Sequence, residues 1–314
     1  MTALLDHQLL FVTGKGGVGK TSVAAALALL GARSGRSTLV CSMDAKNALA
    51  AALDASDFEF EPRQLERNLF GMNMDTEDAL REYLRLFVRV PFVGRIGPLA
   101  RTFDFVADAA PGVKEILGVG KLAYEVRERH YDLVVVDAEA TGHIVAQVGA
   151  PRVIRDLVQV GMVRDQTRWM LDILEDHERT GVVVVTTPEE MPVAETIDLL
   201  GRLDAQTRVA PAAVVANRVL PALFDRRQSE VVERLGGADA VLVEACGTGV
   251  RQVVRAAQLT EARRRVGARH LERLRAGLAP GLPVLYVPEL FTRATGRRVV
   301  SLVASALADE IDVG

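Results

Sequence analysis

The chain has 314 residues, 38 of them basic and 41 acidic, and its net charge of only −3 excludes an overall electrostatic attraction to nucleic acid or to an anionic membrane. Its two cysteines, Cys41 and Cys246, exclude a disulfide framework and a Cys-x-x-Cys metal site, which favours a reducing compartment. Because the sequence also lacks an export signal and a bilayer-spanning apolar run of ~20 residues, we expect a cytoplasmic protein without a transmembrane segment.

Short runs rich in β-branched residues alternate with longer helical patterns along most of the chain. This alternation predicts an α/β fold with a doubly wound, mostly parallel sheet of about seven or eight strands and helices on both faces. Several of the runs are apolar throughout, which is typical of strands that are covered on both faces. The expected strands are residues 9–13, 38–42, 68–72, 133–136, 182–186, 212–216 and 284–287.

The most informative motif follows the first expected strand. The segment Gly14-Lys15-Gly16-Gly17-Val18-Gly19-Lys20-Thr21 matches the pattern G-x-x-x-x-G-K-[ST] and leads into a helical pattern. Glycines allow successive backbone N–H groups to surround phosphate oxygens, and the positive end of the following helix strengthens this binding. We expect Lys20 at the β- and γ-phosphates of ATP and the Thr21 hydroxyl on Mg²⁺. The residues expected to hold the nucleotide here are Gly14, Gly16, Gly17, Val18, Gly19, Lys20, Thr21 and Ser22. The alternative is a glycine-rich turn that happens to hold a lysine.

A second lysine, Lys15, stands directly after the first glycine of this loop. The spacing Lys-Gly-Gly-x-Gly-Lys-Thr resembles that of the deviant phosphate-loop ATPases. This family includes the partitioning and septum-site ATPases, the nitrogenase iron protein, and the arsenite-pump and tail-anchored-protein targeting ATPases. The resemblance implies that Lys15 crosses a dimer interface to the partner's nucleotide, where its charge stabilises the transition state. A solvated loop lysine is the plainer alternative.

The segment after the second expected strand resembles the first switch of the same family. It reads Ser42-Met43-Asp44-Ala45-Lys46-Asn47, and the family form is Ser-Thr-Asp-Pro-Ala-His. The resemblance implies that Asp44 positions or deprotonates the attacking water, and so acts catalytically together with Lys15 and Lys20. Alternatively, Asp44 caps a helix that begins near Ala45.

Asp137 ends the strand expected at 133–136, where phosphate-loop enzymes place a carboxylate that orients Mg²⁺. Residues 137–143, Asp-Ala-Glu-Ala-Thr-Gly-His, resemble the second switch of the arsenite-pump and targeting ATPases, Asp-Thr-Ala-Pro-Thr-Gly-His. Ala140 replaces the proline of that switch. The preceding segment Pro-Gly-Val-Lys-Glu at 111–115 also favours this branch over the partitioning ATPases.

Two segments near the last expected strands resemble the base-binding part of the same family. In Val-Ala-Asn-Arg-Val-Leu-Pro at 215–221, Asn217 corresponds to an asparagine that contacts adenine, and it offers the donor and the acceptor that an adenine edge requires. Alternatively, Asn217 is a turn asparagine at a strand end. The segment Val-Pro-Glu-Leu at 287–290 matches a loop that supports the base, which assigns Pro288 to the nucleotide site. The cysteines with which some relatives bind zinc or arsenite are missing.

We expect a single P-loop ATPase domain over residues 1–314, because no long linker divides the chain. Helical patterns at about 76–128 and 144–180 interrupt the alternation, and they are predicted to form a small helical subdomain that moves with the nucleotide state. Ordinary packing helices would give the same patterns. Large apolar residues in or beside the first insertion either accept an apolar helix of a client protein or belong to the core. They are Met72, Met74, Leu84, Leu86, Phe87, Phe92, Phe103 and Phe105.

The sequence thus predicts a switch that binds and hydrolyses ATP with Mg²⁺, forms a dimer with itself or with a paralogue, and couples nucleotide state to the client-binding helices. Altered switch segments are compatible with a weak ATPase. The alternative is a partitioning or septum-site type of ATPase that binds DNA or membrane through the eight arginines between Arg251 and Arg275. Such runs are more often solvated helix faces, and no nucleic-acid partner is expected. A small-molecule kinase or ligase is a third class, which the switch motifs disfavour.

Overall fold

A computed structural model of the chain describes residues 4–43, 47–88, 113–157 and 162–313. Each of the seven expected strands is present, with small shifts at the ends, and one more strand, β3, was not expected. The strands are β1 (Leu9–Gly14), β2 (Thr38–Ser42), β3 (Arg63–Glu66), β4 (Leu69–Asn73), β5 (Leu133–Asp137), β6 (Thr180–Thr186), β7 (Pro211–Val219) and β8 (Val284–Pro288).

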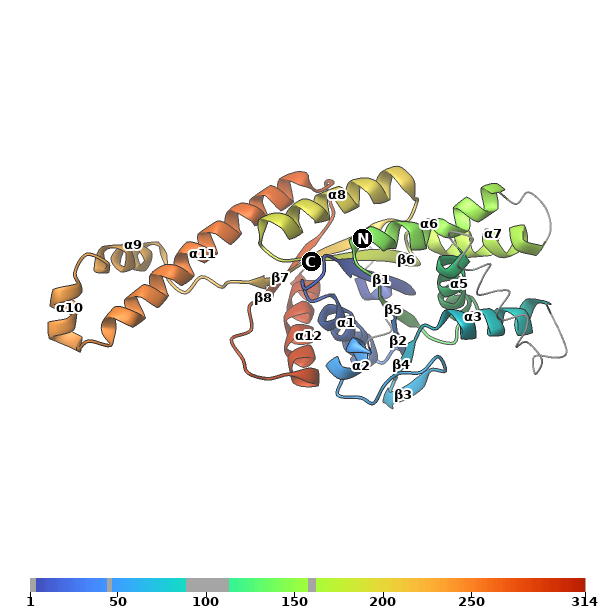
Figure 1. Cartoon of the computed structure of the whole chain (residues 1–314), viewed down its shortest axis with the longest axis horizontal. Helices are drawn as coiled ribbons and strands as arrows, with labels where there is room; N and C mark the ends of the chain where they lie inside the picture. The colour runs from blue at the N-terminus through green and yellow to red at the C-terminus, as the bar shows by residue number, and fades with distance from the viewer. Residues whose placement is uncertain (1–3, 44–46, 89–112, 158–161, 314) are drawn as a thin grey trace.

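These strands form one eight-stranded sheet with the order β3-β4-β2-β5-β1-β6-β7-β8. β3 pairs with β4 in antiparallel fashion, and all other neighbours are parallel. Helices cover both faces of the sheet (Figure 1). The predicted doubly wound, mostly parallel α/β fold is confirmed.

The helices account for most of the remaining chain. In chain order they are the 3-10 turn η1 (Leu4–Asp6), α1 (Lys20–Arg33), α2 (Ala48–Ala52), α3 (Thr76–Tyr83), the π-helical turn η2 (Leu84–Val88), α5 (Val113–Arg127), α6 (Thr141–Leu157), α7 (Met162–Leu174), α8 (Glu190–Gln206), α9 (Arg226–Leu235), α10 (Asp239–Cys246), α11 (Val250–Gly277) and α12 (Gly296–Val313). None of the helices in the described part of the chain has both the length and the apolar character that crossing a membrane requires.

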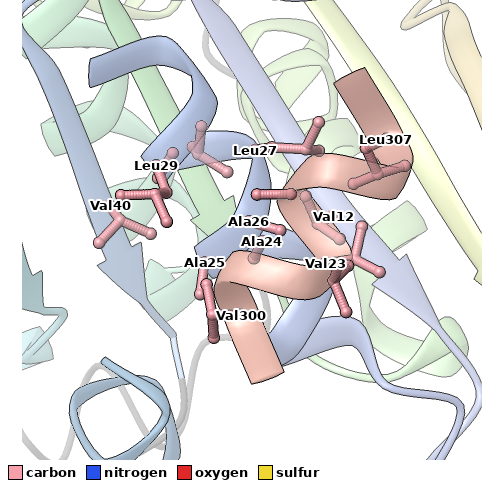
Figure 2. Close-up of a cluster of buried hydrophobic side chains, with 14 of the residues drawn as sticks. Val12, Val23, Ala24, Ala25, Ala26, Leu27, Leu29, Val40, Val300 and Leu307 are labelled. Carbon is pink, nitrogen blue, oxygen red and sulfur yellow. The ribbon is translucent and has the colours of Figure 1, made fainter. Parts of the chain in front are cut away.

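Two layers of side chains fill the space between the sheet and its helices. Successive strand residues point to opposite faces, so that Leu10 and Val12 of β1 pack against α1, α2 and α12, whereas Leu9 and Phe11 pack against α5 to α8. Figure 2 shows the first layer, in which side chains of β1, β2, α1 and α12 meet. Since both faces are buried, the strands need continuous apolar runs, and this is why the sequence pattern identified them.

The helices within the two expected insertions lie together at one end of the molecule, where α6 packs against α5 and α7 (Figure 1). Residues 89–112 of the first insertion lie outside the described residues. At the opposite end, α9, α10 and the first half of α11 extend away from the sheet as a helical arm. We did not expect this arm, because the arginine-rich pattern of α11 indicates a helix without indicating its direction.

The core on the α12 face provides a test of the packing. Leu307 is fully buried in it, whereas Leu302 of the same helix is 41% exposed. Replacing Leu307 by Ala removes buried methyl groups and leaves a cavity, so we expect the free energy of unfolding to fall by about 2–5 kcal/mol. For Leu302→Ala we expect a change of about 0.5 kcal/mol or less. Urea denaturation of both variants measures the difference, and equal losses would contradict this packing.

Candidate functional site

A glycine loop between β1 and α1 forms the centre of the candidate site. Gly14 has φ 152° and Gly19 has φ 96°, a range that residues with side chains rarely adopt. A Cβ atom on Gly14 would lie 2.1 Å from the carbonyl oxygen of Val185 in β6, and one on Gly19 would lie 2.4 Å from the side-chain nitrogen of Asn217. The loop therefore has its shape only because these positions lack side chains, and it leads directly into the positive end of α1, where a phosphate would bind.

Asn217 fastens the loop to β7. Its buried amide donates a hydrogen bond from Nδ2 to the carbonyl oxygen of Val18 (2.8 Å) and accepts one at Oδ1 from the backbone N–H of Arg218 (2.9 Å). Arg218 has φ 57°, an uncommon backbone conformation for a non-glycine residue. One N–H and one lone pair of the amide remain for a ligand. The structure thus brings Asn217 to the glycine loop, and it places this residue within β7 instead of in a turn after the strand.

Asp137 lies at the same edge of the sheet as the loop. It ends β5, is buried, and is the register partner of Val12 in β1 and of Ser42 in β2. The Thr21 hydroxyl belongs to the first turn of α1, which follows the same loop. A hydroxyl and a carboxylate are oxygen ligands of the kind that Mg²⁺ prefers. The chemistry of this donor set fits the expected metal.

The second switch segment is anchored on β1 and opens α6. The Thr13 hydroxyl donates to the carbonyl oxygen of Glu139 (2.9 Å), and Nδ1 of His143 lies 3.4 Å from a carboxylate oxygen of Glu139. α6 begins at Thr141, so that Thr141, Gly142 and His143 form its first turn. The predicted nucleotide-sensing residues are therefore the start of a helix in the second insertion.

The first switch can be placed only in part, because Asp44, Ala45 and Lys46 lie outside the described residues. Met43 donates its backbone N–H to the carbonyl oxygen of Asp137 (3.1 Å), which joins the two switch segments. α2 begins at Ala48 with Asn47 as its N-cap residue. Both roles expected for Asp44, at the attacking water and as a helix cap, fall on these residues and stay predictions.

The two lysines of the loop have different partners. Nζ of Lys15 lies 2.5 Å from Oε1 of Glu195 in α8. Nζ of Lys20 lies 3.4 Å from the carbonyl oxygen of Lys15. Lys15 therefore makes an ion pair within its own chain, which neither the trans role nor the solvated alternative anticipated. The sequence contains no local signal for this pair, since 180 positions separate the two residues.

A cavity of about 750 Å³ opens beside Asn217, between the carboxyl ends of β6 to β8 and α11. Arg218, Glu289 and Phe291 are part of its wall, whereas Pro288 is an exposed residue beside it, at the end of β8. The whole lining consists of residues 188–189, 218–220, 262–264, 266–268, 271, 289 and 291. The structure thus brings the predicted base-binding segments together, and it adds α11, which sequence motifs did not indicate.

A buried ionic cluster joins two helices of the first insertion, α3 and α5. Nζ of Lys121 in α5 lies 2.6 Å from Glu125 of the same helix and 2.8 Å from Glu82 of α3, and Glu125 also contacts His130 (2.7 Å). Burial alone would lower the pKa of Lys121, but the hydrogen bonds with Glu125 and Glu82 outweigh it and raise that pKa above its ordinary value. Lys121 thus stays charged, and it holds α3 against α5.

Several arginines of α11 form hydrogen bonds with other side chains of the chain. Arg264 and Arg265 both donate to the buried carboxylate of Glu261, and the hydrogen bond from Arg264 lowers the pKa of that carboxyl group. Arg275 donates to the hydroxyl of Tyr286 (2.7 Å), with its guanidinium 5.2 Å from the ring centroid. These contacts favour a structural role for this part of the arginine-rich segment over a contact surface for DNA or membrane.

The contact of Gly19 with Asn217 can be tested against Gly17, which has φ 85° and nothing within 4 Å of an added Cβ. We expect Gly17→Ala to lower the free energy of unfolding by about 1–2 kcal/mol, because alanine is strained in the left-handed backbone conformation of this position. Gly19→Ala should cost more, because its Cβ also displaces the Asn217 amide from Val18. Adding Asn217→Ala should then restore part of the loss. Denaturant unfolding of the three variants measures these effects, and equal costs for the two glycines would refute the proposed contact.

The amino-acid sequence is similar to those of several known proteins. A family model described as anion-transporting ATPase matches residues 7–171 and 155–244. The ATPase BagA of Mycobacterium tuberculosis is 30% identical over 299 residues, which are 90% of this chain and 86% of that protein. A putative arsenical pump-driving ATPase of Halobacterium salinarum is 27% identical over 253 residues, 73% of this chain and 39% of its own. ATPase GET3 of Podospora anserina is 28% identical over 159 residues, 49% of this chain and 47% of its own. As its sequence motifs predicted, the chain belongs to the anion-transporting ATPase family.

Proposed function

We propose that this protein binds and hydrolyses ATP with Mg²⁺ as a dimer, and that the nucleotide state moves the helices of the two insertions, which hold a client or partner protein. The observation that carries this proposal is the glycine loop, whose shape depends on the close approach of Gly14 to Val185 and of Gly19 to Asn217. Such a loop ahead of a helix binds phosphate groups. We place the protein in the cytoplasm and expect its partner subunit to be a second copy or a paralogue.

In this proposal each side chain at the loop has one task. Backbone N–H groups from Gly14 to Ser22 surround the phosphates, Lys20 neutralises their charge, and Thr21 and Asp137 hold Mg²⁺, which adds positive charge at the β- and γ-phosphates. Asn217 faces the base with its remaining donor and acceptor, and Pro288 lies beside it. The cavity lined by the residues that directly follow Asn217 supports this placement, because its volume of about 750 Å³ is ample for a base and a ribose.

Hydrolysis would require two further groups. Asp44 positions or deprotonates the water that attacks the γ-phosphate, and Lys15 of the partner subunit adds charge where it develops in the transition state. The differences of the first switch from its relatives are compatible with slow turnover. ATP moves the protein only if it binds the closed form more tightly than the open one.

The helices offer a route for this coupling. The second switch ends in the first turn of α6, so a shift at Gly142 moves the helix to which it belongs, and α6 packs against α5 and α7. The cluster around Lys121 in turn holds α3 to α5. Met72 does not belong to a client surface, because it is fully buried in the core, and Met74 packs partly against the same core. Leu84 and Leu86 are partly exposed, whereas Phe92, Phe103 and Phe105 lie outside the described residues.

The roles of the two lysines predict different defects. Lys20→Ala removes a charge-assisted contact with the phosphates, so ATP should bind about 100-fold more weakly. Lys15→Ala should leave ATP affinity unchanged and lower turnover by about 1,000-fold, as the loss of an arginine finger does. Calorimetric titration with a non-hydrolysable ATP analogue and phosphate-release assays measure the two effects. Equal losses of affinity in both variants would exclude the trans role of Lys15.

Asp44 is tested by the isosteric change to Asn. If its carboxylate acts on the attacking water, Asp44→Asn should lower turnover by about 100-fold or more. The affinity for ATP should stay the same, because Asp44 does not hold the phosphates in this proposal. Phosphate release under saturating ATP, with the affinity measured in parallel, separates the two quantities. Unchanged turnover would remove Asp44 from the reaction.

A further inference from the structure

We propose that Glu195 is a clamp that holds Lys15 within its own subunit, and that dimer formation around the nucleotide must open this clamp. Glu195 would thereby set the protein concentration at which the ATPase becomes active. This inference rests on the proposed function, in which Lys15 acts across the dimer interface. It adds a residue that none of the nucleotide-binding motifs contains.

The fold itself brings the two residues together. β1 and β6 are neighbours, with Gly14 opposite Val185, so the loop that starts at Gly14 lies beside the segment that follows β6. That segment begins α8 at Glu190, and Glu195 therefore lies in the second turn of this helix. Buried side chains of α8 such as Val193 and Leu199 fix the orientation of the helix against the sheet. Glu195 is consequently held at the loop, with its carboxylate 2.5 Å from Nζ of Lys15.

The strength of the contact suits a clamp that opens. The side chains of Lys15 and Glu195 are 30% and 35% exposed, so solvent and salt screen their attraction. Opening one pair of this exposure changes the dissociation constant of the dimer by only about 1.4- to 5-fold. In a symmetric dimer two such pairs must open, so the dissociation constant changes by about 2- to 30-fold in total. A triphosphate carries more negative charge than one carboxylate, so the partner's nucleotide can displace Glu195.

The pair with Glu195 directs the Lys15 side chain to α8 and away from Lys20. Lys20 approaches the backbone carbonyl of Lys15, whereas the Lys15 side chain is bonded to α8. A lysine held by Glu195 cannot at the same time reach across an interface. Breaking the pair therefore belongs to the free-energy cost of assembling the active dimer.

The test compares Glu195→Gln with a matched control in the full-length protein. Asp198→Asn is that control, because Asp198 is an exposed carboxylate of the same helix and pairs with Arg202 (3.0 Å) instead of Lys15. ATP turnover per subunit is measured over several decades of protein concentration. Glu195→Gln should reach half of its maximal turnover at a protein concentration about 2- to 30-fold lower than the unaltered protein. Its maximum should be the same, and the difference should shrink as salt is added, because the pair is partly exposed. Asp198→Asn should follow the unaltered protein.

Other outcomes overturn the inference in distinguishable ways. Coinciding curves for Glu195→Gln and the unaltered protein would exclude the clamp while leaving a concentration-dependent dimer in place. A lower maximum for Glu195→Gln would assign Glu195 to the reaction itself. If turnover per subunit does not depend on protein concentration, the clamp is wrong, and sedimentation with a non-hydrolysable ATP analogue then decides about the dimer. A monomer would also refute the proposed function, whereas a permanent dimer would leave it standing.

Discussion

The close approach of two backbones at the ends of β1 and β6 is the constraint on which the site depends. A Cβ on Gly14 would lie 2.1 Å from the carbonyl oxygen of Val185, so the chain can turn here only without a side chain. Because the loop turns at this point, it lies at the carboxyl ends of the strands, with β5 on one side and β6 on the other. Asp137 of β5 and Glu195 after β6 therefore flank the loop, and Asn217 holds it from β7.

Two ion-paired sites of the molecule differ in how readily their charged groups can separate. The side chains of Lys121 and Glu125 are only 7% and 5% exposed, and opening such a buried pair would leave uncompensated charges. α3 and α5 are thereby held together. The pair of Lys15 and Glu195 is partly exposed, and its opening costs little because water and salt solvate both groups. In the proposed switch, the exposed pair belongs to the part that changes and the buried cluster to the part that moves as a unit.

The arginine-rich helix α11 has a structural connection to the nucleotide region. Its second half packs against α8, and residues 262–264, 266–268 and 271 form one wall of the cavity beside Asn217. Glu261 accepts hydrogen bonds from Arg264 and Arg265, so part of the positive charge of this segment is offset within the helix. The first half continues into the arm of α9 and α10 (Figure 1). The arginine-rich helix α11 thus connects the cavity beside Asn217 to the arm of α9 and α10.

The sequence by itself determined the seven main strands, because a strand buried on both faces must be apolar throughout. It also determined the position of the loop between β1 and α1, since only glycine permits the backbone path at Gly14 and Gly19. It did not indicate β3, a short edge strand with the sequence Arg-Gln-Leu-Glu and no apolar run. The partner of Lys15, the cavity wall from α11 and the direction of the arm were decided by the tertiary structure alone. The pairing of Lys15 with Glu195 follows from the strand order, which places β1 beside β6, and no local pattern in the chain encodes which strands become neighbours.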